Sequence, residues 1–324
     1  IRGGGDGDLV SGHWYRLSAK AVGGRGSEAL DGVWALSANE STFQGGKVAL
    51  YLRDSQAEFD DAEVRPASSN AAPAPVELDG SVPNHPADPL QPENQADLRA
   101  RVLEVGADVG LAFDGDADRV FLVDEQGQGL SGSTTTAIIA AAMLREHPGA
   151  TIIHNLIVSK AVPEVIAEGG GVAVRTRVGH SYIKAVMAEH DALFGGEHSA
   201  HYYFADNYRA DSGLIAAMVV LAEMSRSGQP LSELRQPFER YAASGEINSV
   251  VADPIGTMAR VEEAYMGADR DHLDGLTVDL GDWWFNLRSS NTEPLLRLNL
   301  EAADDEAVAE HSAEVLTLIR GKES

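Results

Sequence analysis

The segment Gly110-Leu-Ala-Phe-Asp-Gly-Asp-Ala-Asp-Arg119 joins two apolar runs, Val109–Phe113 and Arg119–Val123, and both runs are predicted to be strands. The loop between them carries carboxylates at three alternate positions, Asp114, Asp116 and Asp118. Carboxylates that converge from one loop suit a hard divalent cation, which prefers oxygen ligands and keeps positions open for phosphate oxygen. The segment therefore predicts a Mg²⁺ site directly after a buried strand.

Three other interpretations of this acidic loop stay open. A calcium-binding helix–loop–helix motif would use the same aspartates with Glu125 at its twelfth position, but Arg119 stands where that motif needs glycine, and strands flank the loop. A phosphatase with an aspartyl nucleophile would form its phosphoenzyme on Asp114. A solvated acidic turn would leave three carboxylates repelling one another without a shared cation.

Strand and helix patterns alternate on both sides of the loop. Such alternation predicts βαβ units, so we expect tandem α/β domains with mixed sheets. After Ser244 the pattern changes to Val-rich strands and a closing helix, which predicts a small C-terminal α+β domain. The predicted helices cover Gln95–Val105, Ser159–Glu168, Ser181–Glu189 and Asp305–Ile319, and the further strands cover Thr151–Leu156, Val172–Arg177 and Ala192–Phe194.

The N-terminal part of the chain has a weaker pattern. Repeated prolines exclude an ordinary helix or central strand over residues 55–93, because proline lacks a backbone donor and fixes φ. Before that stretch the pattern predicts a helix over His13–Val22 and a strand over Val48–Leu52. The expected domains cover residues 1–62, 63–128, 129–243 and 244–324.

Charge and composition exclude several classes of function. The chain has 324 residues, enough for two or three domains, and its 50 acidic and 25 basic side chains give a formal charge of −25. Such a field repels nucleic acid and anionic membranes, so neither is an expected partner. There is no cysteine and no apolar run long enough for a membrane helix, which fits a cytoplasmic protein. We expect a monomer or a weak homodimer.

Two further loops combine polar groups that suit a sugar phosphate. The sugar loop, Gly195–Phe204, holds Glu197, Ser199 and His201 beside aromatic residues, which can bond hydroxyls and cover a sugar ring. The phosphate loop, Arg288–Pro294, offers a guanidinium fork, hydroxyls and amides that suit a dianionic phosphate. A His-rich surface loop and a polar hairpin loop are the respective alternatives.

A third loop leads into the predicted helix Ser181–Glu189. The amides at its N-terminus could receive an anion, and three basic side chains lie nearby in the sequence: Arg175, Arg177 and Lys184. His180 stands at the entry to this helix, where an ordinary cap or surface histidine is the alternative. The loop therefore adds a possible anion site to the two polar loops.

Over residues 78–324 these segments resemble, in the right order, the characteristic loops of the α-D-phosphohexomutases, and Glu-x-Ser-Ala-His in the sugar loop is similar to the phosphomannomutase branch. The resemblance implies that the acidic loop binds Mg²⁺, with Arg119 and His180 in the catalytic group. It implies that Glu197, Ser199 and His201 contact sugar hydroxyls. It also implies a phosphate site of four residues, Arg288, Ser290, Asn291 and Thr292.

The first 62 residues resemble the family only in part. Ser37 aligns with the family's phosphoserine and Lys47 with its general base, whereas Ala38 and Glu40 replace a histidine and a proline. Arg2 aligns with the family's opening motif as a phosphate contact. The spacing predicts a shortened remnant of the phosphoserine domain, and an anion at Glu40 predicts reduced activity because it repels a phosphate on Ser37.

The resemblance implies a phosphomannomutase-type enzyme, an intramolecular phosphotransferase. It would interconvert hexose 1-phosphate and hexose 6-phosphate through a phosphoserine and a bisphosphate intermediate. Two alternatives stay open: a sugar-phosphate-binding relative without catalysis, and a hydrolase that releases free phosphate. The residues do not choose between mannose and glucose.

Overall fold

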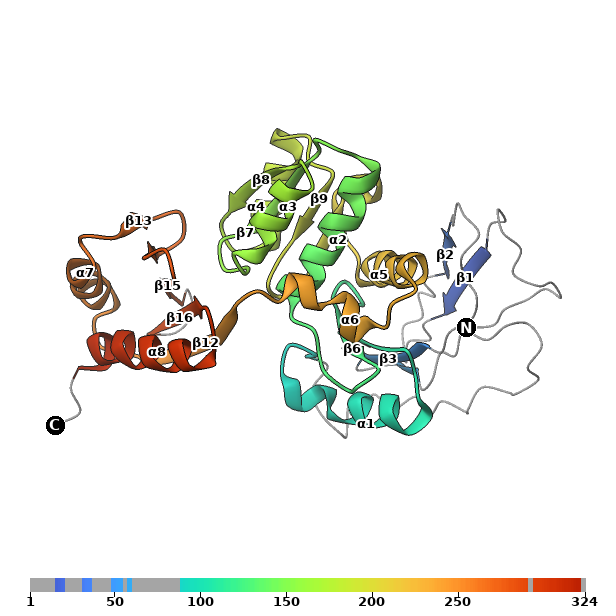
Figure 1. Ribbon diagram of the computed structural model, residues 1–324, viewed down its shortest axis with the longest axis horizontal. Helices are drawn as coiled ribbons and strands as arrows, with labels where there is room; N and C mark the ends of the chain where they lie inside the picture. Colours follow the sequence, from blue (N-terminus) through green and yellow to red (C-terminus); the bar gives the residue numbers. More distant parts are fainter. Residues whose placement is uncertain are drawn as a thin grey trace.

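The computed structural model describes residues 88–290 and 294–321, together with the backbone of four strands nearer the N-terminus. These residues form two α/β layers, a C-terminal α+β part and a β-hairpin (Figure 1). The hairpin pairs β1 (Tyr15–Lys20) with β2 (Asp31–Leu36) in antiparallel register. The predicted fold class, tandem α/β domains with mixed sheets followed by a small α+β domain, is confirmed.

The first layer is a mixed sheet with the strand order β4-β3-β5-β6. β3 runs parallel to β5, whereas β4 and β6 are antiparallel to their neighbours. Both β5 and β6 consist entirely of buried residues, as is typical of strands covered on both faces. The elements are β3 (Val48–Asp54), β4 (Ala57–Phe59), α1 (Ala96–Val105), β5 (Val109–Phe113) and β6 (Val120–Asp124).

The second layer is a mixed sheet with the order β11-β10-β9-β7-β8, in which β7 is parallel to β8 and β9. Its two longest helices, α2 and α5, are capped at their N-termini by Ser131 and Ser212. The side chain of each serine accepts a hydrogen bond from the backbone amide three residues further along the chain. None of the helices in the described part of the chain has the length and apolar content that crossing a bilayer requires. The elements are α2 (Gly132–Glu146), β7 (Thr151–Asn155), α3 (Ala161–Glu168), β8 (Val172–Thr176), α4 (His180–Glu189), β9 (Phe194–Gly196), β10 (Tyr202–Phe204), β11 (Ala210–Asp211), α5 (Gly213–Ser227) and α6 (Leu231–Leu234).

The C-terminal part is an antiparallel sheet with the order β12-β16-β15-β14-β13. Leucines at alternate positions of β16 turn one face of the sheet toward α7 and α8, with which they form a separate apolar core. In Figure 1 this part lies beside the second layer, and β12 leads from one to the other. The elements are β12 (Ala242–Val250), α7 (Pro254–Ala264), β13 (Asp269–Asp271), β14 (Leu276–Asp279), β15 (Trp284–Ser289), β16 (Leu295–Ala302) and α8 (Asp305–Arg320).

One apolar core extends through both α/β layers. It includes Val109 and Leu122 of the first sheet together with Ile138 of α2 and Val220 of α5. The helix α2 contacts β9 of the second sheet and β6 of the first, and α5 packs against both α2 and β6. The expected domain boundary between residues 128 and 129 thus lies between two segments that share one apolar core.

Two glycines let these helices approach functional loops closely. A Cβ on Gly213, at the start of α5, would lie 2.5 Å from the carbonyl oxygen of Arg119. The amide of Gly213 donates a 3.1 Å hydrogen bond to the carbonyl oxygen of Ala117. A Cβ on Gly132, at the start of α2, would lie 2.3 Å from the carbonyl oxygen of His198. Real Cβ atoms do not tolerate such distances, so both helix starts need glycine.

Most predicted elements are confirmed, within two residues at most ends, and β5 matches residue for residue. The helix predicted over His13–Val22 is wrong, because residues 15–20 form β1. Apolar Tyr15, Leu17 and Ala19 alternate with polar side chains in that segment, which is the period of a strand. Within its described residues, the proline-rich stretch contains a short edge strand, β4, and the start of a 3-10 helix, Pro92–Gln95.

We predict that Gly213→Ala lowers the free energy of unfolding by about 1–3 kcal/mol, because the added methyl group pushes α5 away from the acidic loop. Urea denaturation followed by circular dichroism measures this. The control is Gly267→Ala, where a Cβ would meet no atom within 4 Å, and it should change stability by less than about 0.5 kcal/mol. Equal stabilities for the two variants would contradict the close approach.

Candidate functional site

The acidic loop starts where β5 ends. Asp114 follows the last residue of the strand and is buried, and the chain turns at Ala117, whose φ is 60°. The turn returns the chain to β6, antiparallel to β5. Oxygen atoms of the three aspartates, Asp114, Asp116 and Asp118, lie within 4.8 Å of one another. The convergence that the sequence predicted is therefore present.

Arg119 holds the first carboxylate of the loop. Its backbone amide and its Nε donate to the two oxygens of Asp114, at 3.1 and 2.7 Å. Its Nη1 also donates to Asp88, at 3.4 Å. Burial lowers the pKa of Arg119, but the bond and charge of Asp114 outweigh it, so the pKa stands above the ordinary value. Arg119 therefore stays charged and fixes the position of Asp114 through both carboxylate oxygens.

The remaining donor set fits a hard divalent cation. All three side chains offer carboxylate oxygen, the ligand that Mg²⁺ prefers. Asp118 Oδ1 is buried and accepts no hydrogen bond from the described residues. Burial and the charge of Asp114 raise the pKa of Asp118 to about 7. A cation shared by the loop would supply the positive charge that these oxygens lack.

Glu197 is the centre of the sugar loop and is 2% exposed. Its Oε1 accepts from Asn155 Nδ2 at 3.2 Å and from the Gly179 amide at 3.1 Å. Its Oε2 accepts from the Tyr203 hydroxyl at 2.8 Å. The carboxylate thus ties the end of β7, the loop before α4 and strand β10 together. Both of its oxygens already have protein partners.

His201 lies between the sugar loop and the acidic loop. Its Nδ1 lies 3.1 Å from Ser199 Oγ, and its Nε2 lies 3.6 Å from Asp118 and 3.9 Å from Asp211. Its backbone forms an antiparallel bridge with Arg119. Burial lowers the pKa of His201, which favours a neutral ring. Contacts from both layers therefore fix this histidine.

Lys184 of α4 lies next to the sugar loop. Lys184 Nζ lies 2.9 Å from Asp211 and 5.6 Å above the Tyr203 ring. His180 is the first residue of α4 and is exposed. Arg175 forms an ion pair with Asp271 of the C-terminal part. Arg177 Nη2 lies 3.8 Å from Asp274, so all three basic side chains that the sequence offered near this helix have carboxylate partners.

Arg288 of the phosphate loop is also paired. Its Nη2 donates to Glu246 at 2.7 Å, and its side chain is 13% exposed. Burial lowers the pKa of Arg288. His198 of the sugar loop is half-buried within range of the charges of Glu246 and Arg288, and burial lowers its pKa as well. The charges of Arg288 and Glu246 therefore act on His198 of the sugar loop.

The structure brings the acidic loop and the sugar loop together, and it brings the first residue of the phosphate loop toward them. Five predicted residues lie outside the described residues: Arg2, Ser37, Lys47, Asn291 and Thr292. The sequence did not single out Asp211, although it precedes a serine cap and an apolar helix. Its proximity to His201 and Lys184 depends on packing between distant segments, which no local pattern reveals.

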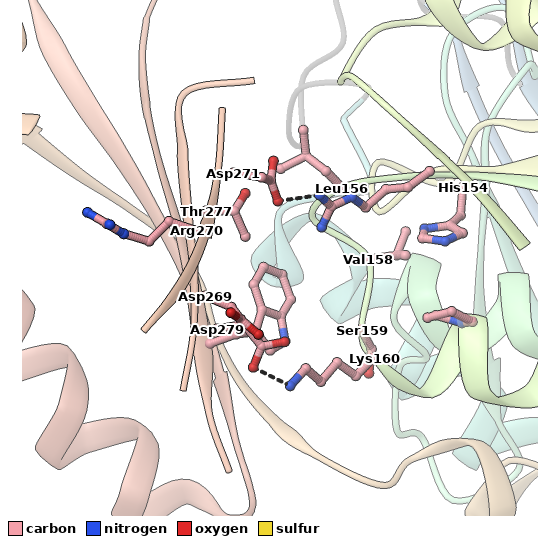
Figure 2. Close-up of a pocket in the computed structure, with 13 residues that line it drawn as sticks. His154, Leu156, Val158, Ser159, Lys160, Asp269, Arg270, Asp271, Thr277 and Asp279 are labelled. Atoms are coloured by element: carbon pink, nitrogen blue, oxygen red, sulfur yellow. Dashed lines mark hydrogen bonds and ion pairs between the residues drawn. The ribbon is translucent and has the colours of Figure 1, made fainter. Parts of the chain in front are cut away.

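A cavity of about 250 Å³ lies elsewhere, between the second layer and the C-terminal sheet. Figure 2 shows Lys160 crossing it to Asp279, and Arg175 lies against Asp271 on its rim. His154 lines it, and burial lowers the pKa of His154 to about 4. Of the residues that the sequence offered for a site, Arg175 lines this cavity, and its ion pair with Asp271 makes the cavity a feature of the interdomain contact.

Three models of one family match successive parts of the chain. They are described as phosphoglucomutase/phosphomannomutase alpha/beta/alpha domain II, over residues 67–128, domain III, over residues 131–241, and the C-terminal domain, over residues 246–318. Each matched range contains one of the loops described above: the acidic loop, the sugar loop and the phosphate loop.

Individual relatives agree with these models. A phosphomannomutase of Salmonella montevideo is 44% identical over 264 residues, which are 78% of this chain and 58% of the relative. A phosphomannomutase of Methanocaldococcus jannaschii is 44% identical and covers 74% of this chain and 54% of its own length. A Burkholderia thailandensis phosphoglucomutase/phosphomannomutase family protein matches in structure with a TM-score of 0.68 and 30% identity, over 76% of this chain and 55% of that one. The chain thus spans little more than half of these relatives.

We predict that Tyr203→Phe lowers the free energy of unfolding by about 1–3 kcal/mol, because it leaves one buried oxygen of Glu197 without a donor. Denaturant titration measures the loss. Tyr202→Phe is the matched control, since the buried Tyr202 hydroxyl near Thr135 makes no hydrogen bond of ordinary geometry within the described residues. An equal cost for both substitutions would mean that Glu197 does not need Tyr203.

Proposed function

The chain belongs to the phosphoglucomutase/phosphomannomutase family, and on this premise we propose that it interconverts hexose 1-phosphate and hexose 6-phosphate. The observation that carries the proposal is the backbone bridge between Arg119 and His201, because it joins the acidic loop to the sugar loop. A sugar hydroxyl held by the second loop then lies beside carboxylates of the first. That juxtaposition is what phosphoryl transfer to a hydroxyl requires.

In the proposed reaction, phosphoserine 37 gives its phosphoryl group to the free hydroxyl of a hexose phosphate, while Lys47 accepts the proton of that hydroxyl. The P–O bond to Ser37 breaks as the P–O bond to the sugar forms. The resulting bisphosphate reverses its orientation and returns the other phosphoryl group to the serine. The roles of Ser37 and Lys47 rest on the family resemblance.

The described residues serve binding and orientation. His201 and Ser199 offer a ring nitrogen and a hydroxyl to the sugar, and Glu197 holds the loop that carries them. Arg288 holds the phosphate that does not react. His180 is proposed to act at the entry of α4, where its exposed side chain can reach a ligand.

The three aspartates of the acidic loop would hold Mg²⁺. When bound, this ion supplies positive charge against the oxygens of the transferred group, which is a main contribution to phosphoryl-transfer catalysis. Among the three aspartates Arg119 bonds only Asp114, so it does not occupy the oxygens of Asp116 and Asp118. The noncatalytic alternative receives less support, because curated relatives at 40–44% identity are named as mutases.

We predict that Asp116→Ala abolishes Mg²⁺ binding, because it removes one of three converging ligands and lowers the total negative charge of the loop by one. Isothermal calorimetry with the metal alone measures this. Asp305→Asn, in the first turn of α8, removes an equal charge far from the loop and should leave the affinity unchanged. Undiminished Mg²⁺ affinity in Asp116→Ala would place the ion elsewhere.

The proposed activity is tested by turnover of mannose 1-phosphate with Mg²⁺ and a hexose bisphosphate activator, coupled to detection of the 6-phosphate. Formation of the 6-phosphate that disappears in Ser37→Ala is the expected result, because only a hydroxyl at position 37 can carry the phosphoryl group. Intact-protein mass spectrometry then finds one phosphate on the unaltered chain and none on the variant. Release of free phosphate without 6-phosphate would support the hydrolase instead.

A further inference from the structure

The sheet of the C-terminal part has one apolar and one polar face. Phe285 and Leu287 of β15 turn toward α7 and α8, so Arg288 and its alternate neighbours turn to the opposite face. Arg297 of β16 lies directly opposite Arg288 in the antiparallel register. The two guanidinium groups therefore start from adjacent positions on the polar face.

One carboxylate lies between these two cations. Glu246 Oε2 accepts from Arg288 Nη2 at 2.7 Å, and Glu246 Oε1 lies 3.3 Å from Arg297 Nη1. Each oxygen of Glu246 thus serves one arginine. Two positive charges against one negative charge leave a net charge of +1 in the cluster.

The two arginines have spare donors. The Nε atoms of Arg288 and Arg297 are both buried, and neither finds a hydrogen-bond partner within the described residues. Like charges directly opposite one another on a sheet repel, and the charge of Arg297 contributes to the lowered pKa of Arg288. An unsatisfied pair of this kind is suited to a ligand with more acceptors and more negative charge than one carboxylate.

The cluster also lies at the proposed phosphate site. Ser290, the next predicted phosphate contact, comes directly after β15, two positions beyond Arg288. The half-buried ring of His198, from the sugar loop, lies within range of the charges of Glu246 and Arg288. A phosphate bound between the arginines would therefore be close to the sugar loop.

We propose that Arg297 is a second phosphate-binding arginine, and that Glu246 holds Arg288 and Arg297 together until the phosphate of the ligand displaces it. This inference rests on the proposed function, since it assigns residues to the same phosphate site. A dianionic phosphate offers two negative charges and several acceptor oxygens, so it satisfies both guanidinium forks better than Glu246 does. Glu246 then leaves the arginines, because it repels the phosphate.

The test compares the binding of mannose 1-phosphate and of inorganic phosphate by calorimetry in three proteins. Arg297→Met should weaken both affinities by about 10-fold or more, because a charge-assisted bond is lost. Glu246→Gln should instead tighten both by about 10-fold at low salt, because the competing carboxylate is gone, and the gain should shrink as salt rises. A gain in affinity cannot arise from misfolding.

Two variants of α7 serve as matched controls. Glu262→Gln removes a carboxylate that pairs with Arg270 on the same part of the chain, and Arg260→Met removes a guanidinium that bonds only Thr257 among the described residues. Neither should change phosphate affinity. Weaker binding in Glu246→Gln, or unchanged binding in Arg297→Met, would overturn the inference while the unaltered protein still binds. If the unaltered protein binds neither ligand, the proposed function fails with it.

Discussion

The shared apolar core of the two α/β layers sets the position of the functional loops. The acidic loop lies between β5 and β6, and the sugar loop begins in β9. The helix α2 contacts both β6 and β9, and α5 packs on α2 and β6, all within one apolar core. The start of α5 touches the acidic loop at Gly213, and the start of α2 touches the sugar loop at Gly132. Because protein interiors are close-packed, neither loop can shift without disturbing both sheets. The bridge between Arg119 and His201 is a consequence of that packing.

The C-terminal part is attached by a different kind of contact. Its polar sheet face meets the second layer through ion pairs and hydrogen bonds, such as Lys160 with Asp279 and the Lys160 amide with Glu301. Trp284 also donates to Glu301 across this face. The protein carries a formal charge of −25, so an anionic ligand is attracted only by local positive groups, of which Arg288 is one. The phosphate loop thus reaches the site on a part that is joined by polar contacts.

The sequence predicted the elements that depend on local pattern. Buried runs such as Val109–Phe113 gave strands at the expected residues, and the three aspartates converge as their spacing indicated. The hairpin strand at residues 15–20 was missed because a short alternating segment fits two periods. The partners of Glu197, and the approach of Lys184 to Asp211, depend on helices and strands meeting across the fold. Spacing along the chain carries no information about such contacts.

The two kinds of contact also determine which pieces of this chain can be exchanged with a relative. A chimera that takes only the first layer from another protein must match foreign side chains to Ile138 and Val220, and each mismatch leaves a cavity or a clash in a common interior. A chimera that joins near residue 242 separates two interiors that share no buried apolar residue. Where the exchanged C-terminal part meets the second layer, the two surfaces need only compatible charges. Recombination during evolution would therefore preserve the first two layers as one inherited unit and vary the C-terminal part independently.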